Sequence, residues 1–373
     1  MKSKRRNAAL VSALLKWFAA NARDLPWRKT NDPYAIWISE IMLQQTQVKT
    51  VLPYWDRWMQ RLPTLTALAR ARPKTIHKLW EGLGYYTRVR NMQRAAKIVQ
   101  QQHGGEFPPA YEDILALPGI GRYTAGAISS IAFNQPKPIL DGNVIRVLTR
   151  LFGIEGNPAD RKVNEALWNL SEALVLHSAR KPSANHASHF NQSLMELGAL
   201  VCIPRTPRCS ECPVASLCVA FRTNRVEELP HRPPKAPPTS RRFAAFVAED
   251  RGRLLVRQRP AGVVNAHLWE FPNLEIVRGN GDVIHLAQTL FGLEAGEIEP
   301  LCTIKHSITR YRITLEVFRV SGKPCGPKNA RWLLPAQLRK LPFTSAHKKV
   351  LELAIQPLHS HIAGDDVRRV RTP

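Results

Sequence analysis

Four closely spaced cysteines constrain the fold of this chain more than any other feature of its sequence. They are separated by six, two and five residues, and they are Cys202, Cys209, Cys212 and Cys218. Thiolates grouped this tightly suit either one tetrahedral metal ion or an iron–sulfur cluster. The first gap exceeds the roughly two to four residues usual within a zinc pair, which favours a cluster, with a structural zinc as the alternative.

The other two cysteines, Cys302 and Cys325, stand apart from this group. A secreted disulfide framework would spread its cysteines more evenly and would normally belong to a shorter chain. The uneven distribution therefore predicts a reducing compartment. We expect a cytoplasmic protein, in the bacterial cytosol and associated with the nucleoid.

The charge balance predicts a polyanionic partner. Lys and Arg total 54 against 29 Asp and Glu, which gives a formal net charge of +25. Such an excess favours nucleic acid. An anionic membrane surface is the second choice, but no long basic amphipathic helix without a core role stands out. No apolar run approaches the ~20 residues needed to span a bilayer, so we expect no membrane partner.

The residue pattern divides the chain into parts. Residues 1–228 have apolar residues at helical spacing and predict a helical region. Residues 229–240 are rich in proline, which predicts a semi-rigid linker. Residues 241–356 predict a smaller α+β domain, and the polar, basic residues 357–373 predict a flexible tail.

Individual elements can be placed within these parts. Helices are expected at 64–70, 73–81, 87–102, 111–117, 122–132, 143–152, 161–178, 186–199, 283–291 and 345–355. Strands are expected at 243–248, 253–258, 301–304 and 311–320. An aspartate before a proline, Asp32-Pro33, predicts the start of a further helix.

A turn with two glycines lies between two of the expected helices. In the stretch Leu-Pro-Gly-Ile-Gly at 117–121, Gly119 and Gly121 allow a tight turn whose backbone N–H groups point outward. At the start of the next helix such groups bind anions, and a phosphodiester is the natural guest. A lone Gly-x-Gly is usually a simple interhelical turn, so the phosphate interpretation depends on the basic, helical context.

Several motifs together resemble a known family. The turn at 117–121, the stretch Leu-Asp-Gly-Asn-Val at 140–144 and the cysteine spacing are similar to those of the helix-hairpin-helix DNA glycosylases that include endonuclease III. Three further segments narrow the resemblance to the adenine DNA glycosylase (MutY) family. They are Leu-Pro-Trp-Arg at 25–28, Trp-Ile-Ser-Glu-Ile-Met-Leu-Gln-Gln-Thr-Gln-Val at 37–48, and Glu-Gly-Leu-Gly-Tyr-Tyr at 81–86.

This resemblance covers residues 8–222 and continues more weakly through 241–355. It implies an all-α helix-hairpin-helix core with one 4Fe-4S cluster per chain, followed by a smaller α+β domain like that of MutT. It implies that the chain removes adenine mispaired with 8-oxoguanine or guanine in double-stranded DNA, by hydrolysis of the N-glycosidic bond. We expect a monomer, because no self-complementary repeat is evident.

The resemblance also implies catalytic roles. Glu40 matches the general acid that protonates the adenine ring and later orients or activates water, and Asp141 matches the carboxylate that stabilises the oxocarbenium ion. Tyr123 and Asn143 match positions that support the sugar and that carboxylate.

Four other residues match positions that bind the substrate. Arg28 and Glu196 match residues of the adenine pocket, and Gln45 and Tyr85 match wedges inserted into the base stack at the mispair. Each has a plainer interpretation when taken alone. Tyr85 would be a core aromatic residue in most proteins, Gln45 a surface residue and Arg28 a solvated cation, so only the combination supports these roles.

The chemistry agrees in part with these assignments. Adenine is a poor leaving group until a ring nitrogen is protonated, so the acid must still hold its proton near pH 7. A free Glu has a pKa of ~4.3, so burial must raise it. The apolar neighbours of Glu40, among them Ile38, Ile41 and Met42, suit that shift. Asp141 by itself is a good helix cap, and both of its roles can hold together.

Residues 241–356 resemble the MutT-like domain that recognises 8-oxoguanine in this family. The carboxylate-rich signature of Nudix hydrolases is absent, so we expect no pyrophosphatase activity. Where the family has Phe-Ser-His against the oxidised base, this chain has Ile308-Thr309-Arg310, of which Thr309 keeps the hydroxyl. A generic stabilising module is the alternative.

Two other functions compete with adenine removal. A glycosylase and lyase for oxidised pyrimidines, like endonuclease III, would have a Lys nucleophile just after the hairpin, where this chain has Tyr123. This difference predicts a monofunctional enzyme that leaves an abasic site. A non-catalytic iron–sulfur protein that binds DNA would have no need of the paired Glu40 and Asp141.

Overall fold

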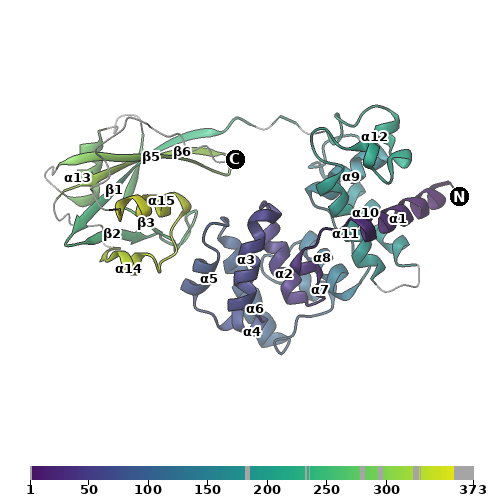
Figure 1. Ribbon diagram of the computed structural model, residues 1–373, viewed down its shortest axis with the longest axis horizontal. Helices are drawn as coiled ribbons and strands as arrows, with labels where there is room; N and C mark the ends of the chain where they lie inside the picture. The colour runs from purple at the N-terminus through teal and green to yellow at the C-terminus, as the bar shows by residue number, and fades with distance from the viewer. Residues whose placement is uncertain are drawn as a thin grey trace. The chain divides into compact units, whose positions relative to one another are not determined.

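The computed structural model describes residues 2–180, 185–231, 233–234, 236–277, 282–292, 297–321, 327 and 329–356. The tail predicted at 357–373 and Cys325 lie outside these residues. The chain (Figure 1) forms two compact units, one from Met1–Arg72 and Thr87–Lys235 and the other from Pro73–Tyr86 and Ala236–Pro373. Among the described helices, none is long and apolar enough to cross a membrane.

The first unit consists of helices, which confirms the predicted all-α core. Its α-helices are α1 (Lys2–Asn21), α2 (Pro33–Leu43), α3 (Val48–Arg61), α4 (Leu65–Arg70), α6 (Thr87–Gln102), α7 (Tyr111–Ala116), α8 (Arg122–Phe133), α9 (Gly142–Phe152), α10 (Arg161–Ser178), α11 (His186–Leu200) and α12 (Val219–Arg222). Its 3-10 helices are η1 (Pro26–Arg28), η2 (Cys209–Glu211) and η3 (Ala215–Leu217).

Helix α3 is an element that the sequence pattern did not predict. Pro53 lies inside it, and an interior proline removes a backbone hydrogen bond and weakens the helical signal. Tertiary packing outweighs this cost, because Val51 and Trp58 are fully buried. The indole N–H of Trp58 also donates to the Tyr34 hydroxyl of α2 at 3.1 Å.

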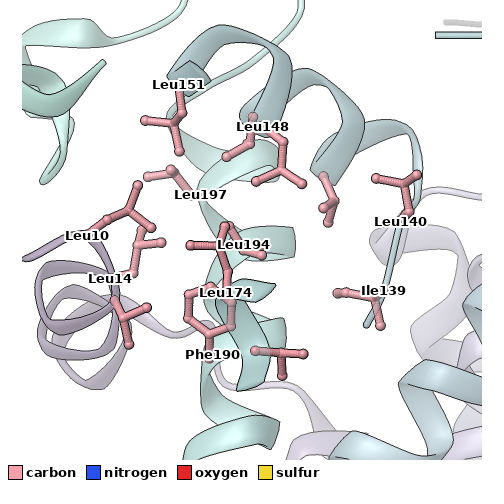
Figure 2. Close-up of a cluster of buried hydrophobic side chains, with 14 of the residues drawn as sticks. Leu10, Leu14, Ile139, Leu140, Leu148, Leu151, Leu174, Phe190, Leu194 and Leu197 are labelled. Atoms are coloured by element: carbon pink, nitrogen blue, oxygen red, sulfur yellow. The ribbon is translucent and has the colours of Figure 1, made fainter. Parts of the chain in front are cut away.

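Helices α1, α9, α10 and α11 share one apolar core (Figure 2). Leu10 and Leu14 of α1 share this core with Leu148 of α9, Leu174 of α10 and Leu194 of α11, and all five side chains are fully buried. Burial of one such side chain contributes ~1.5–3 kcal/mol. The core therefore holds α9 and α11 firmly against each other.

The second unit is built on a mixed sheet. Its central strand β1 (Thr239–Asp250) pairs in parallel with β6 (Tyr311–Val320), and β6 pairs antiparallel with β5 (Ile298–Ile308). On its other side β1 pairs antiparallel with β2 (Arg253–Gln258). The remaining elements are β3 (Trp269–Glu270), β4 (Asn273–Ile276), β7 (Ala330–Leu333), α5 (Pro73–Leu79), α13 (Val283–Phe291), α14 (Pro335–Leu338) and α15 (Ser345–Ala354).

Successive residues of β1 face two separate cores. Ala245 and Val247 pack in one core with Val350 of α15, whereas Phe246 packs in the other with Leu286 of α13. This alternation follows from strand geometry, in which neighbouring side chains point to opposite faces. The sheet is therefore covered by a helix on each face, which confirms the predicted α+β class.

The sheet departs from the sequence expectations at two points. β1 begins inside the segment predicted as a linker, because Thr239 pairs with Tyr311 and its N–H donates to the carbonyl of Arg310 at 2.9 Å. Strands β3, β4 and β7 were not predicted, since each has only two to four residues and such short runs show no readable alternation.

Candidate active site

A cavity of about 600 Å³ lies in the helical unit. Seven of the predicted site residues line it, and they are Arg28, Glu40, Gln45, Tyr123, Asp141, Asn143 and Glu196. They come from segments far apart in the sequence, so the fold alone brings them together. The other predicted substrate-binding residues, Tyr85, Gly119, Gly121 and Thr309, do not line this cavity.

Glu40 reaches the cavity from a helix that is buried along almost its whole length. Asp32 caps that helix, α2, by accepting hydrogen bonds from the N–H groups of Tyr34 and Ala35 at 2.9 and 3.4 Å. The helix carries the carboxyl group of Glu40 inward until the residue is only 6% exposed. The cap and the buried face thus place an ionisable group almost completely out of contact with solvent.

Those surroundings shift the titration of Glu40. The pKa of Glu40 is raised from 4.5 to about 7, mainly by burial, and the charge of Asp141 contributes to this rise. The Tyr123 hydroxyl, which donates to Glu40 Oε2 at 2.7 Å, opposes the rise, and so does the charge of Arg28. The carboxyl group therefore keeps a proton near neutral pH, as a general acid must.

Asp141 is the N-cap of α9 and also part of the cavity wall. Its Oδ1 accepts from the N–H groups of Asn143 and Val144 at 3.0 and 2.7 Å, and its Oδ2 accepts from the Asn143 side-chain amide at 3.1 Å. Burial raises the pKa of Asp141, whereas these hydrogen bonds oppose that rise because they favour the charged form. Asp141 therefore caps α9 and faces the cavity with the same carboxylate.

Behind this carboxylate lies Arg146, which the sequence reasoning missed. Its guanidinium donates to Asn143 Oδ1 at 2.8 Å, to the carbonyl of Gly198 at 2.8 Å and to the carbonyl of Cys202 at 2.7 Å. Arg146 is buried on α9, one helical turn after Asn143. In the sequence, the only sign of this role is an arginine three residues after Asn143. In the structure, Arg146 fixes the side-chain amide of Asn143, which in turn orients Asp141.

Glu196 is a second buried acid on the cavity wall, but its pKa is lowered, whereas that of Glu40 is raised. It accepts from Arg28 at 3.0 and 2.8 Å, and from the backbone and side chain of Arg23 at 2.7 to 2.9 Å. Burial alone would raise its pKa, but these bonds outweigh that effect and lower it to about 2. Arg23 was not predicted, because nothing in the sequence pairs it with a residue so distant.

The two predicted wedge residues occupy unusual backbone conformations. Gln45 has a φ of +56° and Tyr85 has a φ of +47°, a backbone region that residues other than glycine rarely adopt. Gln45 is exposed, and Tyr85 is 44% exposed, which is high for a large aromatic side chain. Arg88 supports the turn before Gln45 by donating to the carbonyl of Gln44 at 2.8 Å.

The glycine turn at 117–121 and the turn around Thr309, which is predicted to contact the oxidised base, also form. Gly119 has a φ of +81°, and a Cβ there would lie 2.7 Å from the Cβ of Asn91, so glycine is required. Gly121 is the N-cap of α8. In the second unit, Thr309 lies in the turn between β5 and β6 with a φ of +51°, and it is exposed.

The four clustered cysteines line one pocket of the helical unit. None forms a disulfide, and Arg150 donates to the sulfur of Cys202 at 3.5 Å. The pKa of Cys212 is raised to about 11, mainly by burial, and the charges of Cys202, Cys218 and Cys209 contribute to this rise. Four thiolates so close together need a positive centre between them, so the residues fit an iron–sulfur cluster.

Removing two of these thiols tests the fit. The Cys209→Ala, Cys212→Ala double variant is expected to lose the brown colour of the protein and its bound iron, and to unfold at a lower temperature. Cys302→Ala is the matched control, because Cys302 is a half-buried free thiol in the other unit. Iron analysis, visible absorbance and thermal unfolding check this. Unchanged iron in the double variant would contradict the assignment.

Three family models match separate parts of the chain. The HhH-GPD superfamily of base excision DNA repair proteins matches residues 38–173, which include Glu40 and Asp141. The iron-sulfur binding domain of endonuclease III matches residues 202–218, which hold the four cysteines. A NUDIX domain matches residues 243–353.

Whole-chain comparisons agree with these matches. The adenine DNA glycosylase of Mus musculus is 35% identical and the match covers 92% of this chain and 78% of the relative. That of Homo sapiens is 34% identical over 92% of this chain and 74% of the relative. The structure of a thermostable thymine-DNA glycosylase superposes with a TM-score of 0.53 at 30% identity, covering 60% of this chain and 100% of the other. The chain therefore belongs to the adenine DNA glycosylase family, as a DNA N-glycosylase that carries a 4Fe-4S cluster.

Proposed function

We propose that this enzyme hydrolyses the N-glycosidic bond of adenine paired with 8-oxoguanine or guanine in double-stranded DNA. The observation that carries the proposal is the pair of carboxyl groups in one cavity, Glu40 with its raised pKa and Asp141 with its charge-stabilising hydrogen bonds. Their different environments suit an acid and an anion, the division of labour used for other glycosidic bonds.

The proposed reaction begins when adenine leaves the base stack and enters the cavity. Glu40 gives its proton to a ring nitrogen, which turns the base into a good leaving group. Asp141 stabilises the positive charge that develops on the sugar as the bond breaks. The carboxylate left on Glu40 then takes a proton from the attacking water, so the acid is restored and an abasic site remains.

Other residues would orient these two groups. Tyr123 holds Glu40 through the hydrogen bond to Oε2, and Asn143 holds Asp141. The ion pair with Glu196 holds Arg28 at the cavity wall, where its guanidinium is proposed to face the polar edge of adenine. Gln45 and Tyr85 are proposed to fill the space that the extruded base leaves, and the N–H groups after Gly119 and Gly121 to bind a phosphate.

The 4Fe-4S cluster would be bound by Cys202, Cys209, Cys212 and Cys218, and it would hold together the loop that carries them. The role proposed for residues 241–356 of the second unit is to recognise the base opposite adenine. Thr309 lies at an exposed turn of these residues. We further propose that the enzyme is a monomer in the bacterial cytosol. The described cysteines form no disulfide, which suits that reducing compartment.

One set of duplexes tests the proposal. Adenine opposite 8-oxoguanine should be excised, whereas thymine glycol and an abasic site should remain uncut. Borohydride should trap no strong covalent adduct, because Tyr123 stands where a lyase has its lysine and a phenol forms no Schiff base. Burial raises the pKa of Tyr123 well above its usual value, so it stays protonated. A trapped adduct would reject the monofunctional assignment.

A further inference from the structure

A buried acid outside the catalytic cavity joins two distant parts of the second unit. Glu81 follows α5 and its side chain is 6% exposed. It accepts a hydrogen bond from the backbone N–H of Phe343 at 2.8 Å and contacts the ammonium groups of Lys78 at 2.8 Å and Lys348 at 3.2 Å. A carboxylate buried in this way is stable only with such partners.

On one side of this contact lies the turn that carries Tyr85. Glu81 immediately precedes Gly82 and Gly84, which have φ values of +106° and +71°. The Trp80 indole donates to the carbonyl of Gly84 at 3.0 Å, and the N–H of Gly82 donates to the Tyr86 hydroxyl at 3.2 Å. The turn is therefore held by its own hydrogen bonds, and fixing Glu81 fixes the backbone that presents Tyr85.

On the other side lies the core beneath the sheet. Phe343 is 1% exposed and packs against Phe271, with ring centroids 6.2 Å apart. The same core contains Val350 of α15 and Ile304 of β5. β5 leads directly to the turn that holds Thr309, so Glu81 touches the core on which the proposed lesion-reading strand rests.

We propose that Glu81 is a positioning residue that ties the Tyr85 turn to the C-terminal domain, and that this tie makes excision prefer 8-oxoguanine over guanine opposite adenine. The inference rests on the proposed function. When the domain binds the oxidised base, the tie holds Tyr85 at one place in the duplex. The chain continues from Tyr86 into α6 at Thr87, so the position of the turn is passed to the helical unit through the backbone itself.

The test compares Glu81→Ala with Glu316→Ala in the full chain with its cluster. Glu316 is the matched control, because it is also a carboxylate of this unit in an ion pair, with Arg242 at 2.7 Å, but it lies away from the Tyr85 turn along the sequence. Single-turnover excision is measured on adenine opposite 8-oxoguanine and opposite guanine. Glu81→Ala should lose about tenfold on the first duplex and little on the second, a typical coupling between sites.

A second background separates positioning from a general structural role. If Glu81 acts through Tyr85, then Glu81→Ala should cause no further loss in a Tyr85→Ala enzyme. Glu81→Gln keeps an oxygen for the Phe343 N–H and should restore part of the preference. Equal losses on both duplexes, or additive effects with Tyr85→Ala, would overturn the proposal.

Binding distinguishes failure of this inference from failure of the proposed function. Duplexes with a non-cleavable 2′-fluoro adenosine give the ratio of affinities for 8-oxoguanine and guanine without any turnover. If wild-type protein excised no adenine, the proposed function would be rejected. The ratio of affinities for the 8-oxoguanine and guanine duplexes would still test the role of Glu81. An unchanged ratio in Glu81→Ala, together with unchanged excision preference, would remove the role assigned here.

Discussion

The Glu40→Gln variant should excise adenine about a thousandfold more slowly than wild type, within the usual contribution of a general acid, while binding mispaired DNA as well as before. Gln has nearly the same shape and can still accept from the Tyr123 hydroxyl, so the cavity stays intact. It cannot give a proton to adenine. Single-turnover excision and duplex affinity measure the two effects, and normal turnover by this variant would exclude Glu40 as the acid.

The pH dependence provides the control for this assignment. Because the pKa of Glu40 is about 7, the wild-type rate should fall about tenfold per pH unit well above pH 7. The Gln variant should lack this fall. The same shift costs stability, since the folded state holds the proton more tightly than the unfolded state, whose Glu pKa is 4.5. Stability is thus lost as pH rises from about 4.5 to 7, and the Gln variant should unfold at a higher temperature at pH 8.

The Asp141→Asn variant should lose excision by about a hundredfold to a thousandfold, as expected when a transition-state charge loses its partner. Asn is a good N-cap and keeps an oxygen for the N–H groups of Asn143 and Val144, so α9 should remain folded. What disappears is the negative charge beside the sugar. Single-turnover rates and thermal unfolding separate the two effects.

Asp32→Asn is the matched control for this variant. Asp32 also caps a helix, α2, through two backbone N–H groups, and it is exposed rather than part of the cavity wall. Its replacement should leave excision nearly unchanged. If both variants lost the same activity, the effect would come from capping, and Asp141 would have no separate electrostatic role.

Local pattern was enough to predict much of the fold. Helices α6 and α10 and strands β2 and β6 begin and end where the sequence places them, because each has a clear period between marked breaks. The pattern failed at α3, where the packing of Trp58 outweighs Pro53. It also gave no sign that Pro73–Tyr86 packs with residues from the far end of the chain.

The candidate site shows the same division. Seven residues of the cavity wall could be proposed from motifs and from the family resemblance, and the structure brings them together. Arg23 and Glu81 could not be proposed. Arg23 meets Glu196 across 173 positions, and Glu81 meets Phe343 across 262. Such contacts depend on how whole elements pack, which no local period encodes.

The two separate cores on the faces of the β-sheet should tolerate substitutions differently. The core with Val350 touches both Phe343 and the strand that leads to Thr309, so a substitution there disturbs the tie at Glu81 as well as the local packing. The core under α13, with Phe246 and Leu286, does not contain Phe343 and meets that strand only at its first residue, Ile298. Apolar substitutions on the α13 side should therefore leave the proposed tie at Glu81 intact, whereas substitutions on the α15 side should disturb it.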